Sequence, residues 1–303
     1  MKNKTLHFRL VDAACLALIL IPLIIGMLLK ILLSPASEGI VITGAQIYFT
    51  LPMPIQDLPV TEAQVNSVLV ILSIFGLCLY LTHGIRAGVQ TKRQLLTEWM
   101  VEKVDGLVRE NMGDYFSGFG PFIAAILGLS ALSSLSSLIG LYPPTSDINV
   151  TAGWAIMVFA LITYYKMKCG PWHYVKSFGD PVAALAPMNL ISEVATPISM
   201  AFRHYGNILS GTIVSVLVAS GLAGLSQMIF GNLPGFLGEF PFLRIGIPAL
   251  LSVYFDVFSG CLQAYIFAVL TMLYVSGAFP QDEYEKRQRR KREKKLKLQQ
   301  QNK

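Results

Sequence analysis

Apolar residues along the 303-residue chain gather into six long runs, and stretches rich in polar and charged residues separate them. A membrane-spanning helix needs about 20 mostly apolar residues. The pattern therefore predicts an all-α integral membrane protein with about six membrane helices. The predicted spans are residues 11–33, 65–82, 115–142, 153–165, 188–228 and 246–279. The composition agrees, because 53% of the residues are hydrophobic and only 14% are charged.

Lysine and arginine residues occupy alternate segments between these spans. If both termini are cytoplasmic, the inner segments hold 21 of them and the outer segments hold only Arg244. The positive-inside rule describes this asymmetry, so we expect a multi-pass protein of the cell (plasma) membrane with both termini in the cytoplasm. The net charge of +6 resides in residues 281–303. That tail is interpreted as a topology signal and a solvated charge run, with contact to anionic lipid or a neighbouring subunit as an alternative.

The pattern divides the chain into three parts. We expect an N-terminal anchor helix and outer segment at residues 1–64, a membrane domain at 65–279, and a basic cytoplasmic tail at 280–303. The first span has an apolar core too long for a cleaved signal peptide, which favours a retained anchor. Charges interleaved with apolar residues predict an amphipathic surface helix at 91–111. Three prolines in the outer segment, Pro52, Pro54 and Pro59, suggest a small cap.

The last two runs are longer than one crossing requires. Residues 188–228 would form a helix of about 60 Å, twice the hydrocarbon thickness. Such a helix must tilt or bend, and Pro197 offers a kink point. A Gly/Pro-rich stretch at 231–241 joins it to the next run. We therefore expect the last two helices to be long, tilted and paired as a slanted hairpin.

Both long runs carry polar residues spaced three or four apart, which places them on one helical face. On the first these are Asn189, Ser192, Glu193, Thr196, Ser199, Arg203, Asn207 and Ser210, and on the second Ser252, Asp256, either Ser259 or Gly260, and Gln263. Hydroxyl and amide groups often join membrane helices by hydrogen bonds, and this simpler interpretation stays open for them. Intramembrane ionisable residues usually mark function, which favours a functional role for Glu193, Arg203 and Asp256.

Arg203 is the most informative of these residues, because a guanidinium stays charged and is costly in lipid. In the predicted topology Glu193 lies toward the cytoplasm, Arg203 and Gln263 mid-membrane, and Thr212 and Asp256 toward the outside. Polar paths thus rise from both surfaces and meet at a positive charge. That arrangement suits two offset half-channels between which another subunit carries the ion.

Other kinds of chemistry have little support. The four cysteines form no CxxC pair, the four histidines form no HExxH, and no glycine-rich nucleotide loop is present. We expect no cofactor, metal, nucleic acid or catalytic site in this chain by itself. A standalone secondary transporter, with Arg203 binding an anionic solute, is the alternative, but no internal repeat supports it. An intramembrane hydrolase would need Ser210 and His204 to meet, and their spacing does not favour that.

Three segments resemble subunit a of the F-type ATP synthase. They are PMNLISEVATPISMAFRHYGNILSG at 187–211, YPPTSDINVT at 142–151 and FSGCLQAYIFAVLTMLYVSGA at 258–278. The surface helix KRQLLTEWMVEKVDGLV at 92–108 is similar too, and the resemblance covers about residues 66–279. It implies an ion-translocating subunit that works with a ring of c subunits, stalk b subunits and other ATP synthase subunits to couple H⁺ or Na⁺ flow to ATP synthesis.

The resemblance also implies individual roles. Arg203 matches the arginine that faces the ring carboxylate and blocks ion leakage, and Gln263 and Asn207 match its polar neighbours. Glu193, with Ser199 nearby, matches the cytoplasmic half-channel. Some family members have an outer carboxylate at the position of Thr212 and a histidine at the position of Asp256. In this chain the carboxylate therefore lies on the last helix instead. His204 replaces a commoner leucine and is interpreted as a packing residue.

Overall fold

The computed structural model of the protein describes residues 2–33, 44–54, 56–85, 91–179, 183–231, 243 and 246–301. Within them, six helices are long and apolar enough to cross a membrane, which confirms the predicted all-α membrane architecture. The six are Phe8–Leu33, Glu62–Thr82, Asp114–Ile139, Ile148–Met167, Ala186–Phe230 and Val253–Gly277. The predicted spans differ from them mainly at their ends, where apolar runs and helix limits need not coincide.

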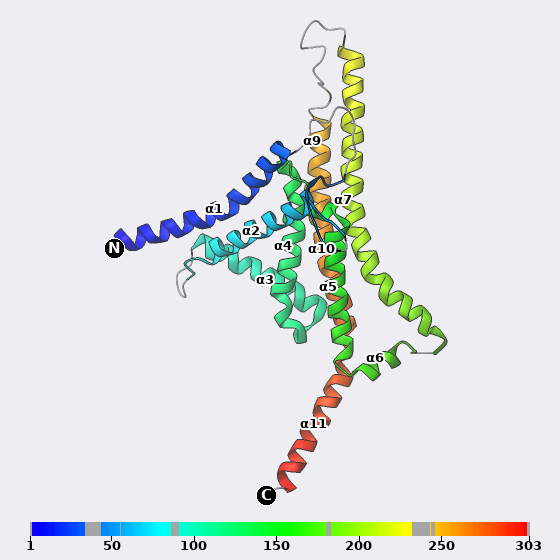
Figure 1. The fold of residues 1–303 in the computed structure, drawn as a ribbon. Coiled ribbons are helices and arrows are strands. Elements are labelled where there is room, and N and C mark those ends of the chain that lie inside the picture. Colours follow the sequence, from blue (N-terminus) through cyan, green and yellow to red (C-terminus); the bar gives the residue numbers. More distant parts are fainter. Residues whose placement is uncertain are drawn as a thin grey trace.

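Figure 1 shows the α-helices coloured from the N-terminus to the C-terminus. They are α1 (Lys2–Leu33), α2 (Glu62–Thr82), α3 (Lys92–Met112), α4 (Gly120–Leu135), α5 (Ile148–Met167), α6 (Pro171–Ser177), α7 (Ala186–Phe230), α9 (Ile247–Ser252), α10 (Gly260–Gly277) and α11 (Gln281–Gln301). Short 3₁₀ turns are η1 (Asp114–Phe119), η2 (Ser136–Ile139), η3 (Pro144–Ser146) and η4 (Ala183–Leu185), and η6 (Val253–Ser259) is a π-helical segment.

The core lies where α3, α4, α5, α7 and α10 meet. Its fully buried side chains include Ile123 of α4, Val158 of α5, Met200 of α7, and Phe267 and Met272 of α10. Burying such a side chain contributes about 1.5–3 kcal/mol in water, but in lipid close packing contributes more than apolar transfer. This packed bundle holds α7 and α10 in a fixed relation to each other.

Helix α7 has 45 residues, so it is about 68 Å long. It changes direction along its length (Figure 1), and Pro197 lies inside it. The chain returns beside it, antiparallel, through α9, η6 and α10 (Figure 1). An antiparallel pair is therefore present, while the long, slanted hairpin stays a prediction. Apart from Gly231, the predicted connecting turn lies outside the described residues.

Helices α1 and α2 pack along each other and extend together to one side of the bundle (Figure 1). They approach closely at Gly76, where a Cβ atom would lie 3.0 Å from the backbone nitrogen of Ile19. The Ser73 hydroxyl donates to the Ile19 carbonyl oxygen at 2.9 Å. Small residues and hydroxyl groups favour this kind of contact between membrane helices.

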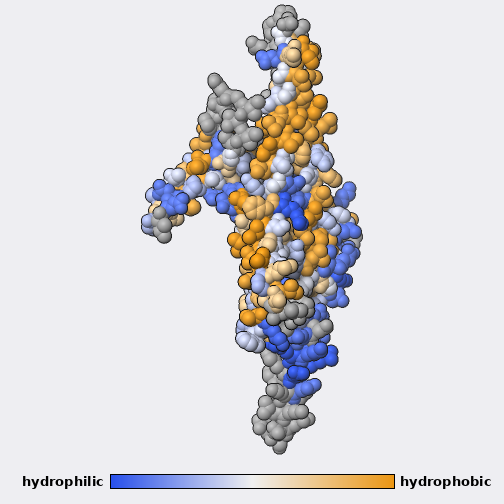
Figure 2. All heavy atoms as spheres, turned by 90° about the vertical axis from the view of Figure 1, so that its right-hand side faces the viewer, coloured by the Kyte–Doolittle hydropathy of each residue, from blue (hydrophilic) through white to orange (hydrophobic). Residues whose placement is uncertain are grey.

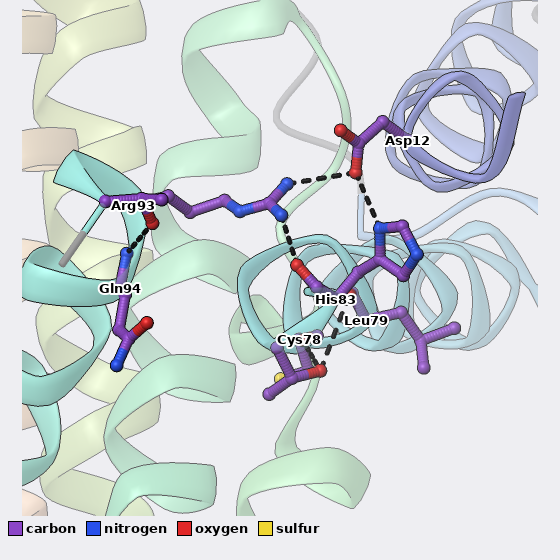
Figure 3. Close-up of polar contacts among 8 residues, drawn as sticks. Asp12, Cys78, Leu79, His83, Arg93 and Gln94 are labelled. Carbon is purple, nitrogen blue, oxygen red and sulfur yellow. Dashed lines mark hydrogen bonds and ion pairs between the residues drawn. The ribbon is translucent and has the colours of Figure 1, made fainter. Parts of the chain in front are cut away.

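Charged groups join α1 to the two helices that follow it (Figure 3). A carboxylate oxygen of Asp12 lies 2.9 Å from both Arg93 Nη1 and His83 Nδ1. Arg93 also donates to the His83 carbonyl oxygen and stacks on the Tyr80 ring, 4.9 Å from its centroid. Helix α1 is therefore attached to the rest of the chain by specific polar contacts.

Part of the predicted cap is a β-hairpin, which the all-α prediction did not include. Strands β1 (Ile47–Leu51) and β2 (Leu58–Thr61) pair antiparallel, and Thr50 lies opposite Pro59. A proline is tolerated here because a two-stranded ribbon leaves edges that need no N–H donor. Pro52 and Pro54 lie between the strands.

Two polar segments are helical: the predicted surface helix and the basic tail, for which no helix was predicted. Helix α3 coincides with the predicted surface helix, and it buries Val108 and Met112 while exposing Leu95 and Trp99. Its position at the membrane surface stays a prediction. The basic tail is helical as α11, and Figure 2 shows this end of the molecule as strongly hydrophilic below a broad apolar surface.

Candidate functional site

Arg203 lies on the middle part of α7 with its side chain exposed, while its neighbours Met200, Ala201 and His204 are buried. No hydrogen bond or ion pair joins its guanidinium to another described residue. Figure 2 shows the side of the molecule formed by α7, where hydrophilic surface interrupts the apolar surface at mid-height. The arginine is therefore exposed and pairs with none of the described acidic groups of its own chain.

One side-chain contact sets the register between α7 and the returning segment. Asn207 Nδ2 donates to Ser259 Oγ at 2.9 Å, and Ser259 Oγ lies 3.1 Å from Asn207 Oδ1. The two segments are antiparallel. Arg203 lies one turn before Asn207 on α7, and Gln263 of α10 lies one turn after Ser259. Helix geometry thus places these two residues at the same depth. Gln263 is buried beside this crossing.

On the side of α7 toward its N-terminus, Glu193 has two donors. Lys166 Nζ and the Tyr174 hydroxyl each lie 2.9 Å from a different oxygen of its carboxylate. The Glu193 side chain is only 6% exposed and that of Lys166 is 30% exposed. Burial, the hydrogen bond to Glu193 and the charge of Glu193 raise the pKa of Tyr174 to about 12. The tyrosine therefore remains a donor throughout the physiological pH range. Ser199 lies exposed further along α7.

On the other side of Arg203, Asp256 and Asn207 line one small cavity of about 10 Å³, the size of a single water molecule. Ser134, Ser137 and Gly260 also line it. Asp256 belongs to the π-helical segment η6, and such segments often occur at functional sites because they re-aim side chains. The structure thus brings an acid, an amide and two hydroxyl groups together.

The remaining predicted residues lie elsewhere. Thr212 is exposed, and its hydroxyl donates to the Ile208 carbonyl oxygen at 3.0 Å, so it does not join Asp256 at the cavity. His204 is fully buried between the rings of Trp154 and Phe267, with Ser130 Oγ 3.3 Å from its Nε2. Those surroundings agree with the interpretation of His204 as a packing residue.

The sequence reasoning missed Ser134 and Ser137. Ser134 is 3% exposed, and its hydroxyl has no hydrogen-bond partner among the described residues. Ser134 fits here because Gly260 has no side chain: a Cβ atom at Gly260 would lie 2.6 Å from Ser134 Cβ. The signal was available as five serines within residues 130–137, but a run of hydroxyl groups does not by itself say which of them faces a site.

The fold and this arrangement define a multi-pass membrane protein with polar groups on both sides of an arginine that lies in a candidate membrane span and has no partner among the described residues. Residues 64–276 match the family model described as ATP synthase A chain. The match covers more than half of the chain, and the chain belongs to this family, whose members are membrane-sector subunits of the F-type ATP synthase and do not themselves carry its catalytic sites. The secondary-transporter alternative gains no support.

Similar proteins agree with this membership. The chain is 33% identical to ATP synthase subunit a of Listeria welshimeri serovar 6b over 198 residues, which are 61% of this chain and 78% of that protein. It is 35% identical to ATP synthase subunit a of Priestia megaterium over 200 residues, or 62% and 79%. With ATP synthase subunit a of Legionella pneumophila (strain Paris) it shares 28% over 225 residues, or 74% and 88%.

Proposed function

We propose that the chain forms two ion half-channels against a ring of c subunits and that Arg203 separates them. A ring carboxylate releases its ion into one half-channel and passes Arg203 as an anion. It then takes up an ion from the other half-channel. Flow of H⁺ or Na⁺ is thereby coupled to rotation of the ring and to ATP synthesis.

The exposure of Arg203 carries this proposal. An unpaired guanidinium in an apolar span is costly, by about 3 kcal/mol or more, unless another molecule or water satisfies it. The described acids of this chain do not pair with it. A carboxylate on a neighbouring subunit satisfies it well, because Coulomb attraction is stronger in low dielectric than in water.

The other residues take roles according to their place. Glu193 and Ser199 line the cytoplasmic half-channel, and Asp256 lines the outer one. Thr212 contributes on the exposed face of α7 rather than beside Asp256. Gln263 and Asn207 limit how tightly the ring carboxylate binds Arg203, because amide groups compete for the same partners.

The setting follows from the charge distribution and the family. We place the chain in the plasma membrane with both termini in the cytoplasm. Residues 65–279 form the ion-translocating domain, residues 1–64 an added anchor with its outer segment, and residues 280–303 a cytoplasmic tail. Besides the c subunits, stalk b subunits, other ATP synthase subunits and lipid are its partners.

Replacing Arg203 with alanine tests the barrier. We expect the assembled complex with Arg203→Ala to lose ATP-driven ion pumping and to leak ions passively. The Arg203 charge repels a cation about 4 Å away by about 4 kcal/mol at an effective dielectric of 20. Removing that charge should therefore increase the passive leak by about 10³-fold. The measurement is ATP-driven transport and passive leak in reconstituted vesicles, with and without Na⁺ and a protonophore.

Arg109→Ala provides the matched control, because Arg109 is an exposed arginine on α3 whose contact with Asp114 is also exposed. This variant should pump and seal like the unmodified complex. Full coupled pumping by an assembled Arg203→Ala complex would refute the barrier role.

A further inference from the structure

Several buried polar side-chain atoms near the start of α2 form no hydrogen bond with a described residue. Among the described residues, these include Tyr48 Oη, Glu62 Oε1, Thr145 Oγ1 and Ser146 Oγ. They come from β1, α2 and η3, and η3 packs against α2. Buried polar atoms in proteins nearly always have a hydrogen-bond partner. A group of such atoms is suited to hold water, because water needs two to four polar neighbours.

Glu62 is the acidic group of this cluster. It is 2% exposed, and its Oε1 lies 3.6 Å from Nζ of Lys30, whose side chain is 40% exposed. Lys30 also donates to the Gly140 carbonyl oxygen at 2.6 Å. A buried carboxylate is costly unless it is paired, and its place at the helix N-terminus also favours its charge. The pair thus connects a buried acid to an exposed amine.

Tyr142 links this cluster to α7. Burial is the main cause that raises the pKa of Tyr142, and the nearby Tyr205, Asp147 and Glu62 raise it further. Tyr205 lies two residues beyond Arg203 on α7. Burial is also the main cause that raises the pKa of Tyr48, and the charge of Glu62 raises it further. Since η3 follows Tyr142 closely along the chain and packs against both α2 and α7, polar groups lead from the start of α2 to α7.

We propose that Glu62 is the ion-collecting carboxylate at the outer mouth of the half-channel, and that Tyr142 and the neighbouring hydroxyl groups lead from it toward α7. This inference rests on the proposed function and its orientation. Glu62 takes a cation from the outer water and releases the same cation to water held by the hydroxyl groups. Lys30 holds the carboxylate in place, which gives the added N-terminal helix a role in ion uptake. The matched family region begins at residue 64, so neither residue of the pair belongs to it.

The test uses Glu62→Gln in the complete complex, reconstituted in vesicles of known orientation. ATP synthesis driven by an imposed gradient is measured while only the outer pH is varied. We expect the rate at alkaline outer pH to fall by about tenfold, the lower end of what a charged site adds to capture rates, and the loss to vanish at acidic outer pH. Repeating the series with and without Na⁺ shows which cation is collected.

Three further variants make the result specific. Glu62→Asp keeps the carboxylate and should recover most of the rate, and Tyr142→Phe keeps the ring and should reproduce part of the alkaline loss. Glu110→Gln is the control, because Glu110 is exposed on α3. A structural role for Glu62 would lower the rate equally at every outer pH, and that outcome would overturn the inference.

The same preparations separate this inference from the proposed function. If Glu62→Gln has an unchanged outer pH profile while Arg203→Ala abolishes coupled synthesis, only the role of Glu62 is wrong. If Arg203→Ala still couples, the proposed function is wrong, whatever Glu62→Gln does. If Glu62→Gln fails to assemble, the Glu62→Asp and Tyr142→Phe profiles decide the question.

Discussion

Lys166→Met removes the ammonium group beside Glu193 and keeps a side chain of similar length. In the structure, Lys166 Nζ and Glu193 Oε2 are 2.9 Å apart. At an effective dielectric of 20 this distance corresponds to about 6 kcal/mol of Coulomb energy. The lysine side chain is 30% exposed and Tyr174 remains as a donor, so solvent screening and the second hydrogen bond reduce the loss. We expect about 2 kcal/mol to remain, between the values for exposed and for buried pairs.

This energy predicts a loss of stability where α5, α6 and α7 meet. Without its ammonium partner, the Glu193 carboxylate stays largely buried, with the Tyr174 hydroxyl as its remaining donor among the described residues. A buried acid that loses a partner destabilises the packing around it, here by about 2 kcal/mol, so the thermal midpoint should fall. The measurement is the thermal midpoint of the assembled complex in detergent.

Two variants control for assembly and charge. Lys176→Met removes a lysine from α6 whose side chain is exposed, and its thermal midpoint should not fall. Lys166→Arg keeps a cation next to Glu193 and should stay close to the original midpoint. An assembled Lys166→Met complex with an unchanged midpoint would refute the idea that this ion pair stabilises the contact between α5 and α7.

Two other predictions concern stability. The pKa of Tyr174 is raised from 10.0 to about 12 in the folded protein. Its contribution to folding stability is therefore complete below pH 10 and is lost as the pH rises toward 12. Tyr174→Phe should flatten the alkaline fall in thermal midpoint over that window, and an equally steep fall would contradict the assignment. Gly260→Ala would place a Cβ atom 2.6 Å from Ser134 Cβ, and we expect it to destabilise the bundle by about 1–3 kcal/mol. Gly128→Ala, where nothing lies within 4 Å of the added atom, should not lower the midpoint in detergent.

Local sequence patterns determined the membrane architecture. Apolar runs of sufficient length predict helices because lipid offers no partners to the backbone, and all six predicted spans are present. Arg203 was identifiable for a similar reason, since one charge within an apolar run contrasts with its immediate neighbours. The polar spacing on α7 also predicts that Glu193, Arg203 and Asn207 share a face.

Only the tertiary structure decided which groups meet. Lys166 and Glu193 lie 27 residues apart, and Lys30 and the Gly140 carbonyl oxygen are separated by 110 residues. Thr212 and Asp256 seemed equivalent by depth, yet only Asp256 lines the small cavity. The β-hairpin and the π-helical turn at η6 also gave no clear local signal. Hydrophobic period and charge specify helices one at a time, whereas the partner of a buried polar group depends on how those helices cross.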